Sequence, residues 1–137
     1  DELWSLVGAN SNPLAAGYIQ EMVKTIRGLG GIAITSTQGM QDLFSLDNGK
    51  YGKGILDSSR IKIVMQMEEQ EARLIQNVLN LSEEEVRQIT RFRRGEGLLC
   101  IGYNHVPIAF YATQKEYDAI TTSPTDLLNR NIKNETV

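Results

Sequence analysis

The sequence first narrows the possibilities by what it lacks. It contains a single cysteine, Cys100, and a single histidine, His105, which excludes an internal disulfide and a histidine-based metal site. No apolar run approaches the roughly 18 residues needed to cross a bilayer, and we expect no signal peptide. These features are typical of a reducing compartment and predict a chain without a transmembrane segment.

A strong charge of one sign is also missing. The 14 basic and 17 acidic residues leave a net charge of −3 and an isoelectric point near 5.2, which disfavours nucleic acid as the main partner of this surface. A length of 137 residues and a hydrophobic content of 41% suit one domain with a real core. We therefore expect no strong direct nucleic-acid binding by this segment.

A phosphate-binding loop is absent as well. No G-x-x-x-x-G-K-[ST] segment occurs anywhere in the chain, so the usual cradle for nucleotide phosphates is missing. The glycines around Lys50 and Lys53 imitate such a loop, but their spacing is wrong and no Ser or Thr follows at the required place. We interpret the run Gly49-Lys50-Tyr51-Gly52-Lys53-Gly54 as a flexible surface loop.

Hydrophobic periodicity predicts alternating helices and strands. Capping signals support two of the helices, since Pro13 suits a helix start and Ser82 begins a capping box with Glu85. The predicted helices are 14–26, a short one around 40–44, 68–79, 82–91 and one from about 115; the predicted strands are 32–35, 60–65, 97–102 and 106–111; residues 5–12 read as a loop. We place one domain at 1–125 and a polar, flexible tail at 126–137.

Two groups of polar residues stand where a nucleotide-hydrolysing site would need them. The chain opens on Asp1-Glu2, and after one helix and one apolar strand it reaches Thr35-Ser36-Thr37-Gln38. An acidic pair can hold the water shell of Mg²⁺ and polarise an attacking water, while an amide can contact the terminal phosphate. This order predicts the ATP-hydrolysing half of a RecA-like motor. Because the chain starts with Asp rather than Met, we interpret it as the back half of an ATPase domain.

The order of motifs then resembles one family. The chain carries, in order, Asp-Glu-x-Trp, a helix ending in Arg, apolar-Thr-Gln, Gly95-Glu96-Gly97-Leu98-Leu99 and Val106-Pro107-Ile108. This order looks like the C-terminal part of the large conjugation ATPases of type IV secretion systems. Those are hexameric RecA-like motors related to the FtsK and HerA translocases. The resemblance covers roughly residues 1–123.

The resemblance implies roles for single residues. Asp1 matches the magnesium-side acid, binding the metal through water, and Glu2 matches the water-activating acid. Gln38 matches the amide that senses the terminal phosphate, since an amide both donates and accepts. Arg27 matches basic residues that face the next subunit, and with Asp1 and Gln38 it is a candidate for nucleotide binding. The alternatives are solvated terminal charges for the acids, a strand-end polar residue for Gln38, and a cation at a helix C-terminus for Arg27.

A second group of basic residues follows the helix at 82–91. In ring ATPases one subunit's arginine commonly reaches the neighbour's nucleotide, and Arg93 and Arg94 are the candidates for this role. Glu96 could hold one of them in a bidentate pair. The alternative is a charged segment that ends the helix and leads into a hairpin.

His105 is predicted to be exposed in the hairpin turn, and Cys100 is predicted to be buried and not nucleophilic.

The expected fold is α/β: a partial RecA-like P-loop NTPase domain of parallel strands flanked by helices, with a C-terminal antiparallel hairpin and without its phosphate-loop half. The resemblance implies a motor that uses ATP and Mg²⁺ to energise conjugative DNA transfer or type IV secretion. It also implies a homo-oligomeric ring, contacts with other secretion-channel proteins, and a cytoplasmic location at the inner face of the membrane. We expect the isolated chain to be inactive and to self-associate through an exposed sheet edge. The alternative function is a non-enzymatic oligomerisation or docking module.

Overall fold

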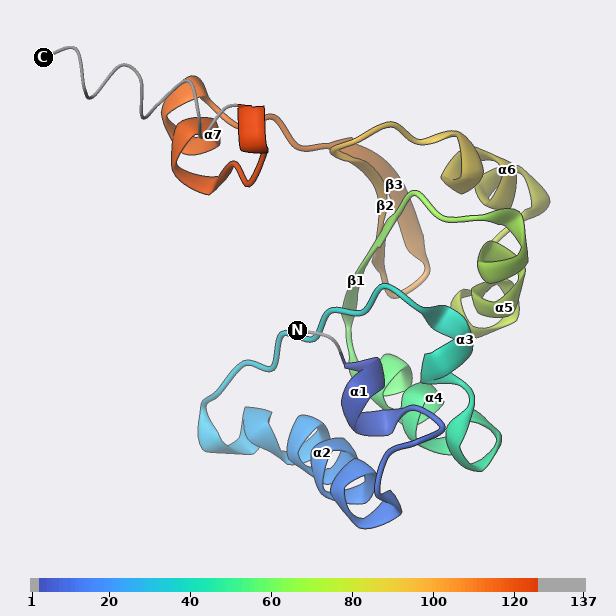
Figure 1. The fold of residues 1–137 in the computed structure, drawn as a ribbon. Helices are drawn as coiled ribbons and strands as arrows, with labels where there is room; N and C mark the ends of the chain where they lie inside the picture. Colours follow the sequence, from blue (N-terminus) through green and yellow to red (C-terminus); the bar gives the residue numbers. More distant parts are fainter. Residues whose placement is uncertain (1–2, 126–137) are drawn as a thin grey trace, which may run out of the picture.

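The computed structural model describes residues 3–125, apart from the side chain of residue 4, and forms a mixed α/β fold around one small sheet (Figure 1). The helices α5 and α6 lie beside the sheet, the N-terminal elements α1 to α4 cluster near one end of β1, and α7 lies apart beyond β3 (Figure 1). In chain order the elements are α1 (Trp4–Val7), α2 (Pro13–Thr25), the 3₁₀ helix η1 (Ile26–Leu29), α3 (Met40–Leu43), the 3₁₀ helix η2 (Leu46–Gly49), α4 (Lys50–Ser58), β1 (Ile61–Met65), α5 (Glu69–Leu79), α6 (Glu83–Arg91), β2 (Glu96–Ile101), β3 (Asn104–Ala109) and α7 (Gln114–Ile120).

The sheet has the order β1-β2-β3, and both pairs of strands are antiparallel. The expected hairpin is confirmed, with a two-residue turn in which Gly102 adopts φ +61°. The mixed α/β class is also confirmed. The expectation of parallel strands is wrong for β1, which pairs with β2 in antiparallel register, Val64 opposite Leu98. Periodicity alone could not show this, because both kinds of pairing accept an apolar strand.

The two faces of the sheet differ sharply in burial. Val64, Leu98 and Cys100 are buried and share one core with residues of α5 and α6. On the opposite face, Ile63 of β1 and Val106 of β3 are half exposed. Strand residues two apart face the same side, so α5 and α6 cover one face of the sheet and leave an apolar face uncovered among the described residues.

A second core holds the N-terminal elements together. Leu3, Val7, Ala16, Leu43 and Ile55 are buried in it. Met40, in α3, packs against both this cluster and the core under the sheet. The two cores therefore meet at α3, immediately after the segment that carries Gln38.

Local signals explain where several helices begin. The predicted capping box is present in α6: the Ser82 hydroxyl accepts from the Glu85 N–H at 3.2 Å, and the Glu85 carboxylate accepts from the Ser82 N–H at 2.7 Å. In α2, Asn12 caps the helix by accepting from the Leu14 N–H at 2.9 Å, and Pro13 occupies the first turn. These two helix starts confirm the prediction from the sequence.

Three local predictions are wrong. Residues 5–7 belong to α1 instead of a loop, and the glycine-rich stretch is α4, which starts after Gly49 at φ +78°. Residues 31–37 run without strand pairing within the described chain, and Ile32 and Ile34 are 85% and 88% exposed. A strand needs a neighbour for its backbone groups; in this segment the Ser36 carbonyl oxygen accepts from the Leu3 N–H, and the Gly31 N–H donates back to the Ile26 carbonyl oxygen at the helix end.

Candidate functional site

The acidic pair Asp1 and Glu2 lies outside the described residues, but the residue that follows it has a defined place. The Leu3 N–H donates to the Ser36 carbonyl oxygen at 2.8 Å, and the Leu3 side chain is buried. The bond joins the first described residue to the segment that ends in Gln38. The backbone next to the acidic pair therefore lies alongside the segment that carries the predicted phosphate-sensing amide.

Gln38 stands at the bend between this extended segment and α3, and its side chain is exposed. Next to it, the Oγ1 atom of Thr37 is buried and has no hydrogen-bond partner among the described residues. Buried hydroxyls almost always have a partner. The Thr37 hydroxyl is therefore a buried polar group whose hydrogen bond the described residues do not supply. An amide and a hydroxyl at this corner are groups that can contact a phosphate, while the two carboxylates that the sequence predicts for the same site belong to residues 1 and 2, outside the described part.

Arg27 lies exposed on η1, at the far end of α2 from the Pro13 start. Its backbone carbonyl accepts from the Gly30 N–H at 3.1 Å, which closes the helix end. Figure 1 places η1 away from the connection between α6 and β2. The two predicted groups of arginines therefore occupy separate parts of this chain.

Arg93 and Arg94 occupy a tight turn between α6 and β2. The Glu96 N–H donates to the Arg93 carbonyl oxygen at 2.9 Å, and Gly95 has φ +86°, as the third residue of a type II turn requires. Both arginine side chains are exposed. The predicted bidentate pair with Glu96 is not observed among the described residues; its Oε2 atom instead accepts from the Arg93 backbone N–H at 2.8 Å.

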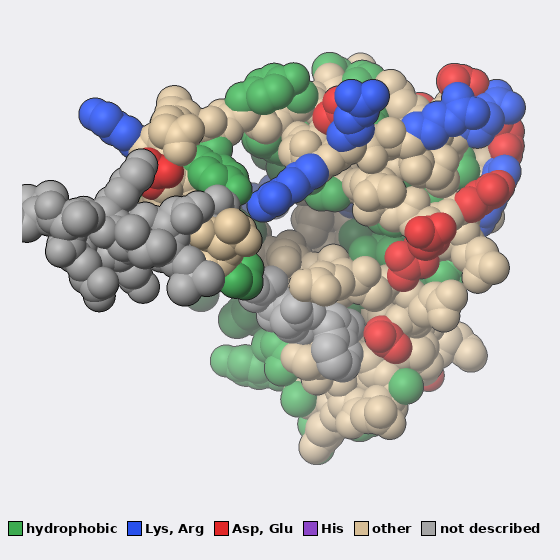
Figure 2. All heavy atoms as spheres, turned by 45° about the horizontal axis from the view of Figure 1, so that its top comes forward, with side chains coloured by type: hydrophobic (Ala, Val, Ile, Leu, Met, Phe, Trp, Pro, Cys, Tyr) green, Lys and Arg blue, Asp and Glu red, His purple; other side chains and the backbone are tan. Residues whose placement is uncertain are grey.

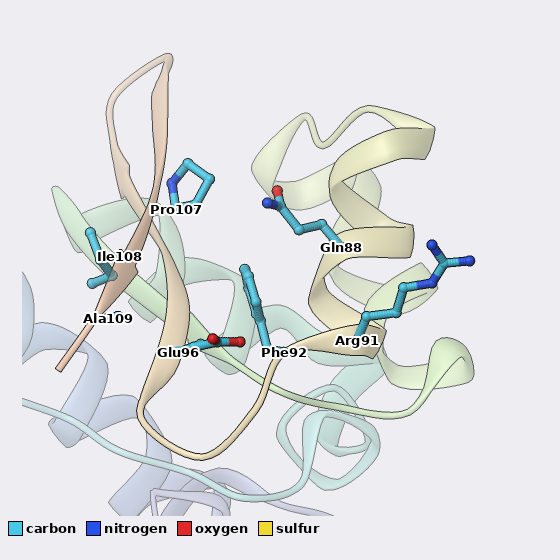
Figure 3. A pocket seen from close by; sticks show the side chains of 7 residues that line it. All are labelled: Gln88, Arg91, Phe92, Glu96, Pro107, Ile108 and Ala109. Atoms are coloured by element: carbon cyan, nitrogen blue, oxygen red, sulfur yellow. The ribbon is translucent and has the colours of Figure 1, made fainter. Parts of the chain in front are cut away.

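A shallow hollow of about 390 Å³ lies beside this turn. In Figure 3 the Phe92 ring stands between α6 and the β2–β3 hairpin, Gln88 extends toward Pro107, and the Arg91 guanidinium points away from the hairpin. The residues that line it are Gln88, Arg91, Phe92, Glu96, Pro107, Ile108 and Ala109. The buried Phe92 ties the start of the arginine turn to the core under the sheet.

The sequence interpretation missed a polar contact beneath α6. His105 lies in β3 rather than in the turn, its side chain is only 10% exposed, and its Nδ1 atom is 2.7 Å from Glu85 Oε1. Burial raises the pKa of the Glu85 carboxyl, but hydrogen bonds from Ser82 and His105 lower it more, so the net pKa lies below its usual value. The prediction of an exposed histidine is wrong because the pairing of β2 with β3 includes His105, opposite Cys100.

Cys100 is buried, as the sequence predicted. Burial raises the pKa of its thiol, the Glu85 charge raises it further, and Lys62 opposes both effects. The thiol therefore stays protonated near neutral pH and is a poor nucleophile. Among residues 3–125, no group of three or more histidine, cysteine or acidic side chains could hold a metal ion.

Ion pairs occupy much of the charged surface of α5 and α6. Figure 2 shows acidic and basic side chains interleaved on the right side of the molecule. Arg73 pairs with Glu83 at 2.6 Å and with Glu69 at 3.2 Å, and Arg87 pairs with Glu84 at 2.7 Å. These glutamates thus have partners within their own chain.

Among residues 3–125, no helix has the length and apolar character needed to cross a membrane.

Comparison with known proteins identifies the family of this chain. Residues 1–129 match the family model described as the TraG P-loop domain. The fold is similar to that of VirB4 of Thermoanaerobacter pseudethanolicus, with a TM-score of 0.76 and 30% sequence identity over 85% of this chain and 31% of that one. The chain thus spans about a third of the length of that protein, and comparison with curated proteins gave no significant match. The family match and the structural similarity confirm the resemblance to conjugation ATPases, and the chain belongs to the TraG P-loop domain family.

Proposed function

We propose that this chain is the hydrolysis half of an ATP-driven motor that energises conjugative DNA transfer or type IV secretion. The observation that carries the proposal is the hydrogen bond from the Leu3 N–H to the Ser36 carbonyl oxygen. It supports a common site for the acidic pair Asp1-Glu2 and for Gln38, in a chain that belongs to a P-loop family.

Each residue has a distinct task in this proposal. Glu2 accepts a hydrogen bond from the attacking water and orients it for in-line attack. Asp1 holds a water of the Mg²⁺ shell, and Gln38 donates to a terminal phosphate oxygen while accepting from the attacking water. Bound MgATP supplies the phosphoanhydride that is cleaved and the cation that neutralises its charge.

The other half of the nucleotide site lies outside this chain. The sequence contains no phosphate-binding loop, and the glycine-rich stretch that imitates one is helix α4. We therefore propose that the isolated chain binds ATP weakly or not at all and does not hydrolyse it, and that the longer protein does.

Arginines 93 and 94 would act on the nucleotide of a neighbouring subunit. Their exposure and the turn that carries them support this role, because a transition state rich in negative charge is stabilised by a guanidinium. Arg27, exposed on a separate element, is a further candidate for such a contact. The role requires a homo-oligomeric ring, which we propose is hexameric, with other secretion-channel proteins bound to it.

We also propose a cytoplasmic location, with the ring held at the inner face of the membrane by the secretion complex.

A docking role is the second candidate for the isolated chain. The uncovered apolar face of the sheet and the exposed Ile32 and Ile34 favour it, since such surfaces commonly contact another protein. Self-association through a free sheet edge belongs to the same proposal, and light scattering that shows a clean monomer at high concentration would exclude it.

The deciding experiment is ATP hydrolysis in the presence of Mg²⁺. It compares this chain, a longer form that includes the phosphate-binding loop, and that longer form with Glu2→Gln. Turnover in the longer form alone, abolished by the substitution, is the expected result. Lack of turnover in both forms, under conditions that favour ring assembly, would favour the docking role.

A further inference from the structure

Glu96 holds the arginine turn through the backbone of Arg93. The Glu96 N–H donates to the Arg93 carbonyl oxygen at 2.9 Å, and Glu96 Oε2 accepts from the Arg93 N–H at 2.8 Å. One residue therefore binds both backbone polar groups of Arg93. A carboxylate that accepts from a backbone N–H forms a stronger hydrogen bond than a neutral acceptor does.

The rest of the turn is fixed from both sides. Phe92, just before it, is 8% exposed within the core under the sheet. On the other side the Gly95 carbonyl oxygen accepts from the Phe110 N–H at 2.8 Å. A Cβ atom at Gly95 would lie 2.8 Å from the Phe110 carbonyl oxygen, so the backbones pass too closely for any side chain there. With Glu96 in place, the turn has little freedom to move.

The two guanidinium groups remain unpaired within residues 3–125, although a carboxylate is only two or three residues away. Elsewhere in the chain, Arg73 and Arg87 are paired with carboxylates. Glu96 Oε2 accepts from the Arg93 backbone N–H, and neither guanidinium forms an ion pair with Glu96, so both guanidinium groups are available to an external anion. Glu96 thus orders the backbone of the turn without neutralising the charges of Arg93 and Arg94.

We propose that Glu96 is a positioning residue that orients the Arg93–Arg94 turn toward the polyphosphate of a nucleotide bound to the neighbouring subunit. The inference rests on the proposed function, because it assumes that at least one of these arginines acts on that nucleotide. Glu96 itself contacts no phosphate. Glu96 acts through the backbone of Arg93. A small shift of that backbone would move the guanidinium at the end of the long arginine side chain away from the reacting phosphate.

The substitution series separates positioning from charge. Glu96→Gln keeps a carbonyl oxygen that can accept from the Arg93 N–H, whereas Glu96→Ala removes the acceptor. In the longer, ring-forming protein, we expect Glu96→Ala to lower kcat for ATP by about 10- to 100-fold, the loss typical of a misplaced catalytic group. The KM for ATP should stay within about threefold, since uniform binding is untouched. Glu96→Gln should retain most of the wild-type kcat.

A double-mutant cycle tests whether Glu96 acts through the arginines. Glu96→Ala is combined with Arg93→Ala and with Arg94→Ala, and circular dichroism with urea unfolding confirms that each variant folds. We expect Glu96→Ala to cause no further loss of kcat in the background of the arginine that acts. A full, undiminished effect in both backgrounds would overturn the inference, as would a Glu96→Gln variant as impaired as Glu96→Ala.

The same data distinguish this inference from the function on which it rests. If Arg93→Ala, Arg94→Ala and their double variant all keep wild-type kcat, the trans role of the arginines fails and the positioning role fails with it. If an arginine variant is impaired while Glu96→Ala keeps wild-type kcat, the trans role stands and the positioning role of Glu96 is refuted.

Discussion

Replacing Gly52 by alanine has two opposing effects on the free energy of unfolding: a gain in helix propensity and a loss from overpacking. Gly52 lies inside α4 and is buried, and alanine in place of glycine within a helix stabilises it by up to about 1 kcal/mol. A Cβ atom at this position, however, would overlap the Leu43 carbonyl oxygen and would lie 2.9 Å from Leu43 Cγ. The obstacle is partly backbone, so relief requires α3 and α4 to move apart.

The second effect should win. Overpacking of a filled core costs about 1–3 kcal/mol, and a backbone obstacle places Gly52 toward the upper end of that range. After subtraction of the helix gain, we expect Gly52→Ala to lower the free energy of unfolding by about 1–2 kcal/mol.

Gly54, in the same helix, provides the matched control. A Cβ atom there would overlap Gln20 Nε2, the far end of a flexible side chain. Gln20 can swing aside and lose only its exposed hydrogen bond to the Lys50 carbonyl oxygen, 3.3 Å long, whose contribution of about 0.5–1 kcal/mol offsets the helix gain. Gly54→Ala should therefore leave stability within about 0.5 kcal/mol of wild type.

Urea unfolding followed by circular dichroism at 222 nm measures both variants against the wild-type chain. The expected result is a lower midpoint for Gly52→Ala, an unchanged midpoint for Gly54→Ala, and the same slope for all three proteins. A Gly52→Ala variant as stable as wild type would refute the reasoning, because it would mean that α3 and α4 do not pack as closely as described.

Two further predictions concern residues of α6. Ile89→Ala should lower the free energy of unfolding by about 2–5 kcal/mol because the side chain is fully buried, whereas Ile34→Ala, at an exposed position, should change it by less than about 0.5 kcal/mol; equal effects in urea unfolding would contradict the burial pattern. The Glu85 pKa is lowered in the folded chain, so its contribution is complete above its unfolded pKa of about 4.3 and is lost as the pH falls through the lower folded value. Wild-type stability should therefore fall more steeply than that of Glu85→Gln between pH 5 and pH 3, and parallel pH profiles from urea unfolding would exclude this linkage.

The parts of the fold that follow from local chemistry could be predicted from the sequence. Ser82 and Glu85 define a helix start within four residues, and a tight turn joins β2 to β3 as expected, although it lies at residues 102–103 rather than 103–105. Gly52 shows the limit. Its neighbours imitate a loop by composition, but its role is to let α4 approach Leu43, a contact that no local pattern records.

The roles given to the candidate site residues stay predictions. The order of Glu2 and Gln38 along the chain led us to expect a shared site, and the Leu3–Ser36 hydrogen bond places the backbone next to Glu2 alongside the segment that carries Gln38. The sequence could also place Glu96 near two arginines. It could not show whether the carboxylate contacts a guanidinium or a backbone N–H, because that choice depends on the geometry of the four-residue turn from Arg93 to Glu96.

The packing of Met40 against both cores has a consequence for cooperativity. Met40, with a flexible thioether that adapts to irregular neighbours, packs against both the N-terminal helices and the layer formed by the sheet, α5 and α6, and Phe44 beside it packs against the second of these. The Met40 N–H also donates to Glu71 Oε1 of α5 at 3.2 Å. While these contacts hold, the two halves should unfold in one transition. If they loosen, each half has a core of its own and can melt separately.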